Sequence, residues 1–162
     1  MFFHVFKKNN ILNKNRMPGK EKGTYILILY LQQKHFIDIG KLGQFYFKRG
    51  YYSYVGSAFG PGGLRARLTH HVKIADKPHW HIDYLRKKAK IKEIWVTDHF
   101  EKIEHEWALN LRKMDGASIP VPGFGCSDCK CPAHLFYFQH RPLNKQFQKI
   151  AAGMGNKILT PQ

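Results

Sequence analysis

Residues suited to phosphoryl chemistry border the apolar faces of two expected helices. Apolar side chains recur at helical spacing in both segments: Leu64, Leu68 and Val72 in the first, and Ile103, Trp107, Leu111 and Met114 in the second. Arg67 and His71 lie one turn apart at one edge of the first stripe, and Glu106 borders the second stripe with Asn110 one turn further on. We expect these side chains to converge on one concave surface.

This set of residue types suits the cleavage of a phosphodiester bond. A carboxylate can hold a hard divalent cation, an arginine can neutralise charge on the phosphate, and a third group must deprotonate water. Tyrosines on adjacent strands are candidates for the third role. Two simpler interpretations stay open: Arg67 and His71 form only a solvated helix edge, and Glu106 pairs only with a lysine or arginine.

The charge of the chain favours a polyanionic partner. Its 162 residues include 27 Lys and Arg against 11 Asp and Glu, which gives a formal net charge of +16. The basic residues are spread from Lys7 to Lys157, which indicates nucleic acid, and the alternative is a merely solvated basic surface. The N-terminus is a poor signal peptide, and no apolar run reaches the ~20 residues of a membrane span. We therefore expect a soluble intracellular protein with no membrane partner.

One domain with two tails is the expected organisation. Residues 1–20 are expected to form a flexible N-terminal extension, residues 21–140 the domain, and residues 141–162 a basic C-terminal tail without an assigned element. The expected strands are 23–31, an antiparallel meander of short strands within 36–56, 91–98 and 134–138. The expected helices are 63–73, 78–90 opened by Pro78, and one that starts at a capping box of Asp98 and Glu101 and ends near Asp115. The fold class is therefore α+β, with a central, mainly antiparallel sheet flanked by three helices.

A glycine-rich junction precedes the first helix. The stretch "FGPGGLR" (Phe59 to Arg65) fits a loop whose backbone N–H groups hold a phosphate, and the alternative is that its glycines only turn the chain. The later stretch "HWHIDYL" carries histidines that either contact the substrate or only border a packing helix. The residues expected to contact nucleic acid are Ser57, Gly62, Gly63, Arg65, His70, His79 and His81.

Several motifs together resemble a known nuclease superfamily. "GTY" at 23–25 and "YVG" at 54–56, followed by the helices that carry Arg67 and Glu106, look like the GIY-YIG superfamily. More closely, "GYYSYVGSAFGPGGLRARLTHH", "HWHIDYL", "EHEWALNL" and "VPGFGCSDCKCPAHLF" resemble its small Uri-type endonuclease branch, formerly a domain of unknown function. The resemblance covers 23 to about 138 and implies a three-stranded core, here extended by the extra hairpin "FIDIG…FYFKRG".

The resemblance implies a role for each residue of the site. Tyr25 and Tyr54 would lie side by side on neighbouring strands, and one of them would activate the attacking water. Arg67 would stabilise the transition-state phosphate, His71 would hydrogen-bond nearby, and Glu106 would bind one Mg²⁺ or Mn²⁺. An unperturbed tyrosine has a pKa of about 10, so a tyrosine base needs nearby positive charge, which Arg67 and the cation would both supply.

The chain also departs from the family pattern. Many relatives place a lysine directly after the second motif, where this chain has Ser57, so positive charge there must come from Arg65 or another basic side chain. Glu104 borders the opposite edge of the helical stripe from Glu106. We prefer Glu106 as the metal ligand, with Glu104 as the alternative.

Three cysteines lie close together in one loop. Cys126, Cys129 and Cys131, with His134 nearby, supply enough sulfur and nitrogen ligands for a zinc ion. Their spacing is tighter than that of a typical zinc knuckle, in which two ligand pairs are well separated. Reduced loop thiols are therefore the favoured interpretation, and zinc is the alternative.

These observations predict a metal-dependent endonuclease that acts on nucleic acid, with DNA favoured over RNA. Two alternatives come from other classes: a nucleic-acid-binding module of the same fold without turnover, and a zinc-stabilised adaptor built around the cysteines. Because the chain shows few base-reading residues, a protein partner is a possible source of specificity. The sequence indicates no oligomeric state.

Overall fold

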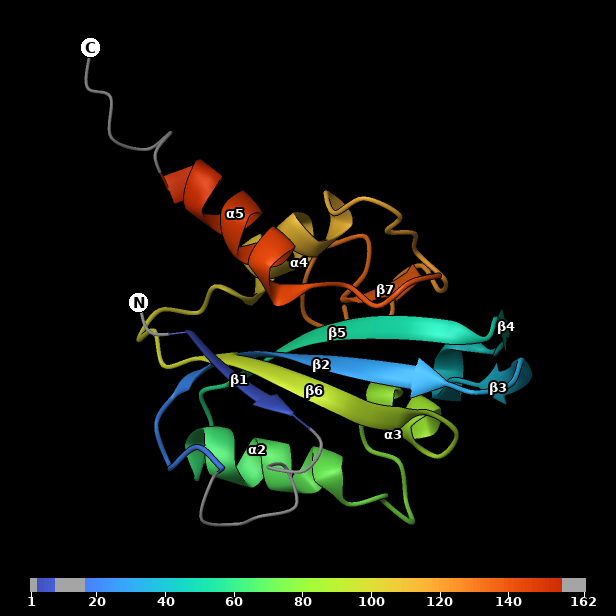
Figure 1. The fold of residues 1–162 in the computed structure, drawn as a ribbon. Helices are drawn as coiled ribbons and strands as arrows, with labels where there is room; N and C mark the ends of the chain where they lie inside the picture. The colour runs from blue at the N-terminus through green and yellow to red at the C-terminus, as the bar shows by residue number, and fades with distance from the viewer. Residues whose placement is uncertain (1–2, 8–16, 156–162) are drawn as a thin grey trace.

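A nearly continuous apolar strand lies at the centre of the computed structural model, which describes residues 3–7 and 17–155. Strand β2 (Gly23–Leu31) pairs antiparallel with β5 (Gly50–Ala58) on one side and with β6 (Lys90–Thr97) on the other. Strand β1 (Phe3–Lys7) extends the sheet beyond β6, and β7 (Leu135–Phe138) extends it beyond β5. The strand order is therefore β1-β6-β2-β5-β7 (Figure 1).

Side chains of β2 alternate between two apolar cores, one on each face of the sheet. Tyr25, Leu27 and Leu29 belong to the first core, whereas Ile26 and Ile28 belong to the second. Because both faces are covered, the strand is apolar at nearly every position and does not alternate with polar residues.

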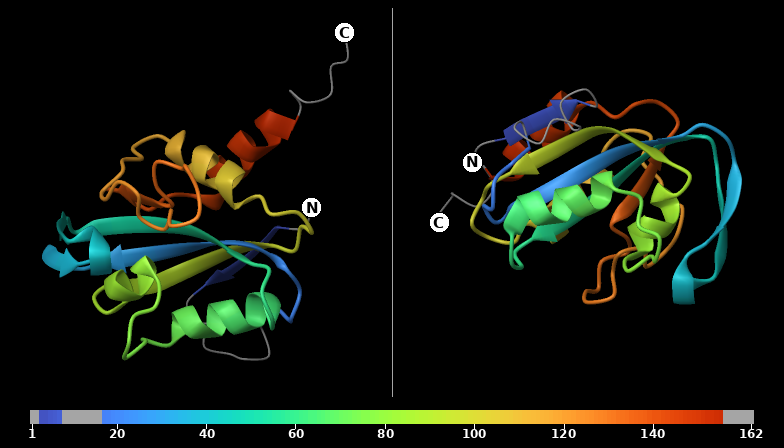
Figure 2. Two further views of the ribbon diagram at one scale, coloured as in Figure 1. Left: turned by 180° about the vertical axis from the view of Figure 1, so that it is seen from behind. Right: turned by 90° about the horizontal axis from the view of Figure 1, so that it is seen from below.

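Two pairs of helices cover the two faces of the sheet. Helices α2 (Gly63–Val72) and α3 (His81–Arg86) lie on the first face, and α4 (Glu104–Arg112) and α5 (Asn144–Gly155) lie on the second (Figures 1 and 2). The predicted α+β class with a central antiparallel sheet is confirmed. Among the helices of the described residues, none has the length and apolar character that crossing a membrane requires.

The hairpin of the expected meander forms a sheet of its own. Strands β3 (His35–Asp38) and β4 (Gln44–Phe47) pair only with each other among the described strands and are joined by a 3-10 turn, η2 (Gly40–Leu42). Ile37 and Phe47 attach this hairpin to the first core. The strands that extend the central sheet are instead β1 and β7.

Helix α3 is shorter than the predicted helix over 78–90. The carboxylate of Asp83 accepts hydrogen bonds from the backbone N–H groups of His79, at 2.9 Å, and Trp80, at 3.0 Å. These bonds satisfy donors that precede the first turn, so the helix begins at His81 and not at Pro78.

Helix α4 begins five residues later than predicted, with its N-cap at Ile103 instead of Asp98, and it spans Glu104–Arg112. The side chain of Thr97 accepts a hydrogen bond from the backbone N–H of His99, and the ring of His99 accepts one from the N–H of Glu101. These local bonds hold a loop between β6 and α4. The predicted capping box of Asp98 and Glu101 is therefore wrong.

Both predicted tails contribute regular structure. Residues 3–7, expected to be flexible, form β1 because Phe3 and Val5 pack against the second core while the strand pairs with β6. The expected C-terminal tail contains α5, which buries Phe147 in the same core. The flexibility expected of 8–16, like the rest of the tail at 156–162, lies outside the described residues.

Candidate active site

A cavity of about 280 Å³ lies where β2, β5 and α2 meet the residues around the start of α4 and the loop before β7. It brings together three of the five predicted catalytic residues, Tyr25, Tyr54 and Arg67. His71 stands directly behind Tyr25, and Glu104 occupies the position in the cavity wall that was expected for Glu106. Four of the expected functional groups, a tyrosine pair, an arginine and a carboxylate, therefore do converge.

A buried hydrogen bond joins Tyr25 to His71. The distance between Tyr25 Oη and His71 Nε2 is 2.7 Å, and His71 is 1% exposed. Burial, and after it the neighbouring His70, lower the pKa of His71 to about 3, so its ring is neutral at neutral pH. Its Nδ1 atom has no hydrogen-bond partner among the described residues. A neutral imidazole with one acceptor nitrogen can accept the hydrogen bond of the Tyr25 hydroxyl.

The two tyrosines are held in the neutral form by the protein alone. Burial raises the pKa of Tyr25, which the nearby Tyr54 raises further, and Arg67 only partly opposes the increase. Burial likewise raises the pKa of Tyr54 against the influence of Arg67. The expected positive charge is present, but burial outweighs it, so a tyrosinate base is not preformed.

The glycine of the second motif makes room for the tyrosine of the first. Tyr25 is opposite Gly56 in the β2–β5 register, and Tyr54 is opposite Leu27, so the two tyrosines are diagonal neighbours across the strands. A Cβ atom added at Gly56 would lie 2.6 Å from Tyr25 Cζ. Any side chain at Gly56 therefore displaces the phenol that hydrogen-bonds His71.

Arg67 stacks on a residue that the sequence did not assign to the site. Its guanidinium carbon lies 4.1 Å from the centroid of the Trp80 ring, and it forms no ion pair with a carboxylate among the described residues. Lys102 adds a second cation to the cavity lining. Trp80 and Lys102 come from the loops before α3 and α4, and neither loop carries a periodic signal that would have predicted its path.

The structure places Glu104, and not Glu106, in the cavity wall. The Glu104 side chain is 17% exposed, and its Oε1 lies 3.9 Å from Nε2 of His105. Glu106 is exposed on α4. The position expected for Glu106 is therefore corrected: Glu106 borders one edge of the apolar stripe, and the structure places Glu104, at the opposite edge, in the cavity wall. A second carboxylate, Asp128, also lines the cavity.

The N-terminus of α2 is capped by the chain itself. The backbone N–H groups of Leu64 and Arg65 each donate to a carbonyl oxygen of segment 17–21 at 2.8 Å, and the Arg65 side chain donates to another at 3.2 Å. Gly62 and Gly63 adopt positive φ angles of 81° and 55°, so they are needed to turn the chain. The predicted phosphate cradle is filled by the protein's own carbonyl groups, and these residues lie outside the cavity lining.

Of the remaining residues expected to contact nucleic acid, Ser57 lines the cavity. His70 lies 3.0 Å from the carboxylate that caps α3, and the backbone N–H of His79 donates to the same carboxylate. His81 Nδ1 accepts a hydrogen bond from the backbone N–H of Gly125 at 3.0 Å, which fixes a residue of the cavity wall. The three histidines therefore support the site from outside its lining.

Two cysteines and two histidines cluster beside the cavity. Nδ1 of His105 lies 3.1 Å from Sγ of Cys131, and Nε2 of His134 lies 3.4 Å from Sγ of Cys129. The four ligand atoms all lie within 4.8 Å of one another, an arrangement compatible with zinc. The alternative zinc set, Cys126, Cys129 and Cys131 with His134, is corrected in part, because Cys126 is outside this cluster and His105 belongs to it. His105 was missed because no short spacing links it to a loop more than twenty residues later.

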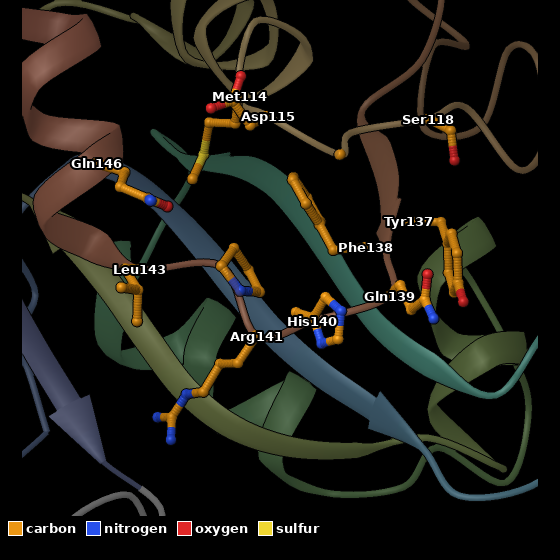
Figure 3. A pocket seen from close by; sticks show the side chains of 12 residues that line it. Met114, Asp115, Ser118, Tyr137, Phe138, Gln139, His140, Arg141, Leu143 and Gln146 are labelled. Carbon is orange, nitrogen blue, oxygen red and sulfur yellow. The ribbon is translucent and has the colours of Figure 1, made fainter.

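A second cavity, of about 390 Å³, lies where the end of α4 meets β7 and the start of α5 (Figure 3). Met114 and Phe138 contribute apolar wall, and Arg141 forms an ion pair with Glu93 of β6 at 3.3 Å. This cavity contains none of the residues predicted for catalysis. The candidate active site is therefore the smaller cavity around Tyr25.

Comparison with known proteins gives one family. The sequence pattern of a domain of unknown function, DUF123, matches residues 24–156, most of the chain. No curated protein and no solved structure shows a significant match.

Proposed function

The chain belongs to the DUF123 family, and we propose that it is a metal-dependent endonuclease that hydrolyses phosphodiester bonds of nucleic acid, with DNA as the expected substrate. The observation that carries this proposal is the single cavity shared by Tyr25, Tyr54, Arg67 and Glu104 in a chain of net charge +16. The same residue types are those implied by the resemblance to the GIY-YIG superfamily. Membership of that superfamily is part of the proposal.

The carboxylates of the cavity suit a hard divalent cation such as Mg²⁺ or Mn²⁺. Glu104 and Asp128 both line the cavity, and carboxylate oxygens are the ligands that these ions prefer. The nearest ionic contact of Glu104 is to His105 at 3.9 Å, so its lone pairs remain available. When bound, such a cation would neutralise phosphate charge and lower the pKa of water.

Arg67 is the candidate for stabilising negative charge that develops on the phosphate. Its stack on Trp80 orients the guanidinium while leaving its N–H groups available to phosphate oxygens. Lys102 supplies a second positive charge in the same cavity. It takes the place of the lysine that relatives carry at the position of Ser57.

Tyr25 and His71 provide a path for the proton of the attacking water. Tyr25 Oη takes this proton while it passes its own phenolic proton to Nε2 of neutral His71, 2.7 Å away. The path needs no free tyrosinate, which the raised pKa of Tyr25 makes costly. Because the pKa of His71 is about 3, the protonated ring costs roughly 5 kcal/mol at neutral pH, so it holds the proton only transiently and returns it after the phosphodiester bond breaks. The Tyr54 hydroxyl lines the same cavity as a hydrogen-bond donor to the phosphate.

A substrate panel tests the proposal. Purified protein is incubated with single-stranded, duplex and branched DNA and with RNA, in Mg²⁺, Mn²⁺ or EDTA. We expect cleavage that EDTA abolishes and that Arg67→Ala slows by about 100- to 1000-fold. Arg65→Ala is the matched control, since this neighbouring arginine lies outside the cavity lining, and it should retain the wild-type rate.

Two results would contradict the proposal. Binding of nucleic acid by the wild type without cleavage of any substrate would leave a binding module. An equal loss of rate in Arg65→Ala and Arg67→Ala would show that the cavity around Tyr25 is not the site of cleavage.

A further inference from the structure

We propose that His105, Cys129, Cys131 and His134 bind a structural zinc ion that fastens the loop before β7 to helix α4. His105 lies in the first turn of α4, whereas the other three residues lie in or directly after the loop that follows Val121. The metal would therefore join two segments that are distant in the sequence. This inference stands whether or not the protein cleaves nucleic acid.

The distances within the cluster fit one tetrahedral ion. With Zn–S bonds of about 2.3 Å and Zn–N bonds of about 2.05 Å, neighbouring sulfur and nitrogen ligands lie about 3.5 Å apart. The observed separations are 3.1 Å between His105 and Cys131 and 3.4 Å between His134 and Cys129. All four ligand atoms fall within 4.8 Å of one another, so they can share one centre.

The pairing of ligands favours a single zinc ion over an iron–sulfur cluster. In two-iron clusters with two cysteines and two histidines, the cysteines bind one iron and the histidines bind the other. Here each cysteine is adjacent to a histidine, as expected when all four surround one ion. Four protein ligands also fill the tetrahedral shell and leave no open position, which is the mark of a structural site. Binding would release the two thiol protons to solvent.

The loop is held near its binding geometry before any metal arrives. The backbone N–H of Gly123 donates to the carbonyl oxygen of Pro132 at 2.8 Å, and that of His134 donates to Phe124 at 2.8 Å. The carbonyl oxygen of His134 in turn accepts a hydrogen bond from Val55 of β5 at 3.0 Å. These bonds close the loop on itself and tie it to the sheet, which lowers the entropic cost of assembling the ligands.

The metal would also stabilise one wall of the catalytic cavity. His105, Cys129 and His134 all contribute to its lining. The Nε2 atom of His105 faces Glu104 Oε1 at 3.9 Å, while the Nδ1 atom faces the sulfur ligands. A ligand histidine commonly donates its second N–H to a carboxylate, which fixes both side chains. Zinc would thus orient Glu104 from behind.

Metal content and spectroscopy test this inference directly. We expect one zinc per wild-type chain by elemental analysis, and for the Co²⁺ form the visible absorption of a tetrahedral ion with a thiolate-to-cobalt charge-transfer band. Cys129→Ser and Cys131→Ser should weaken zinc binding by more than the roughly 10- to 100-fold that loss of an outer-shell partner causes. Cys126→Ser is the comparison variant: Cys126 contacts Cys129 but lies outside the four-ligand set, so this substitution should weaken zinc binding far less than either ligand substitution.

An experiment on the wild type alone guards against variants that fail to fold. Zinc should slow the alkylation of Cys129 and Cys131, read by mass spectrometry, by at least about tenfold, because a metal-bound thiolate is not free to react. The rate at Cys126, which contacts Cys129 but is not a proposed ligand, should change much less than the rates at Cys129 and Cys131. Iron in place of zinc, an octahedral Co²⁺ spectrum, or equal protection of all three cysteines would overturn the inference.

Discussion

The buried, neutral ring of His71 should make the stability of the folded protein depend on pH. Burial, followed by the nearby charge of His70, lowers the pKa of the folded ring to about 3, against about 6.5 in an unfolded chain. Between these values the unfolded chain binds a proton that the folded protein does not. Stability contributed by the neutral ring is therefore complete above about pH 6.5 and is lost as the pH falls.

The size of this loss follows from the two pKa values of His71. Between about pH 7.5 and about pH 5, protonation of the unfolded chain should reduce the free energy of unfolding by about 2 kcal/mol. The charges of Arg67 and Arg86 lower the pKa of His71 further, as burial does, whereas the charge of Asp83 raises it. The pKa of about 3 already includes these influences.

Urea denaturation of wild type and His71→Gln at both pH values is the appropriate assay. Glutamine keeps a polar side chain but does not titrate, so the wild type should lose about 2 kcal/mol more than the variant over this range. Other groups that titrate in acid, such as Asp83, are common to both proteins and cancel in the difference. Equal losses in the two proteins would refute the reasoning, because His71 would then have its ordinary pKa in the folded state.

Three further predictions concern the second motif, the start of α3 and the basic surface. Gly56→Ala should lower the free energy of unfolding by about 1–3 kcal/mol, because its Cβ clashes with Tyr25. Gly60→Ala should leave the free energy of unfolding unchanged, because its added Cβ meets no atom within 4 Å. Equal effects of the two substitutions in urea denaturation would contradict this prediction. Asp83→Ala should lower the free energy of unfolding by about 1 kcal/mol or more, because two backbone N–H groups at the start of α3 lose their acceptor. A urea midpoint equal to that of the wild type would show that Asp83 does not stabilise the start of α3. The logarithm of the Kd for a DNA oligonucleotide should rise linearly with the logarithm of salt concentration. The slope of this line should be smaller by about one in Arg67→Ala, because one phosphate contact is lost. A Kd that does not depend on salt would exclude phosphate binding by the charged surface.

Regular periodicity made parts of the fold predictable. The nearly continuous apolar run 23–31 predicted a buried strand, and the spacing of Leu64 and Leu68 predicted α2, which the structure has at Gly63–Val72. Both patterns arise directly from burial against the sheet. Tyr25, Tyr54 and Arg67 lie on regular elements of the fold, and all three line one cavity.

Side-chain caps and long-range contacts decided what the sequence did not show. The late start of α4 depends on hydrogen bonds made by Thr97 and His99. The presence of Glu104, and not Glu106, in the cavity wall depends on which side of α4 meets the cavity. The approach of His105 to Cys131 depends on how the loop before β7 folds back on the chain. None of these features has a sequence period, because the start of α4 is set by local side-chain hydrogen bonds and the other two are set by tertiary packing.

The most direct test of the proposed active site compares Glu104→Gln with Glu106→Gln in Mn²⁺-dependent cleavage of DNA. The two residues are two positions apart at the start of one helix, but only Glu104 lines the cavity. We predict that Glu104→Gln slows cleavage by about 100-fold or more, while Glu106→Gln, equally folded by circular dichroism, retains nearly the wild-type rate. Unchanged cleavage in Glu104→Gln, or a loss confined to Glu106→Gln, would contradict the proposed site.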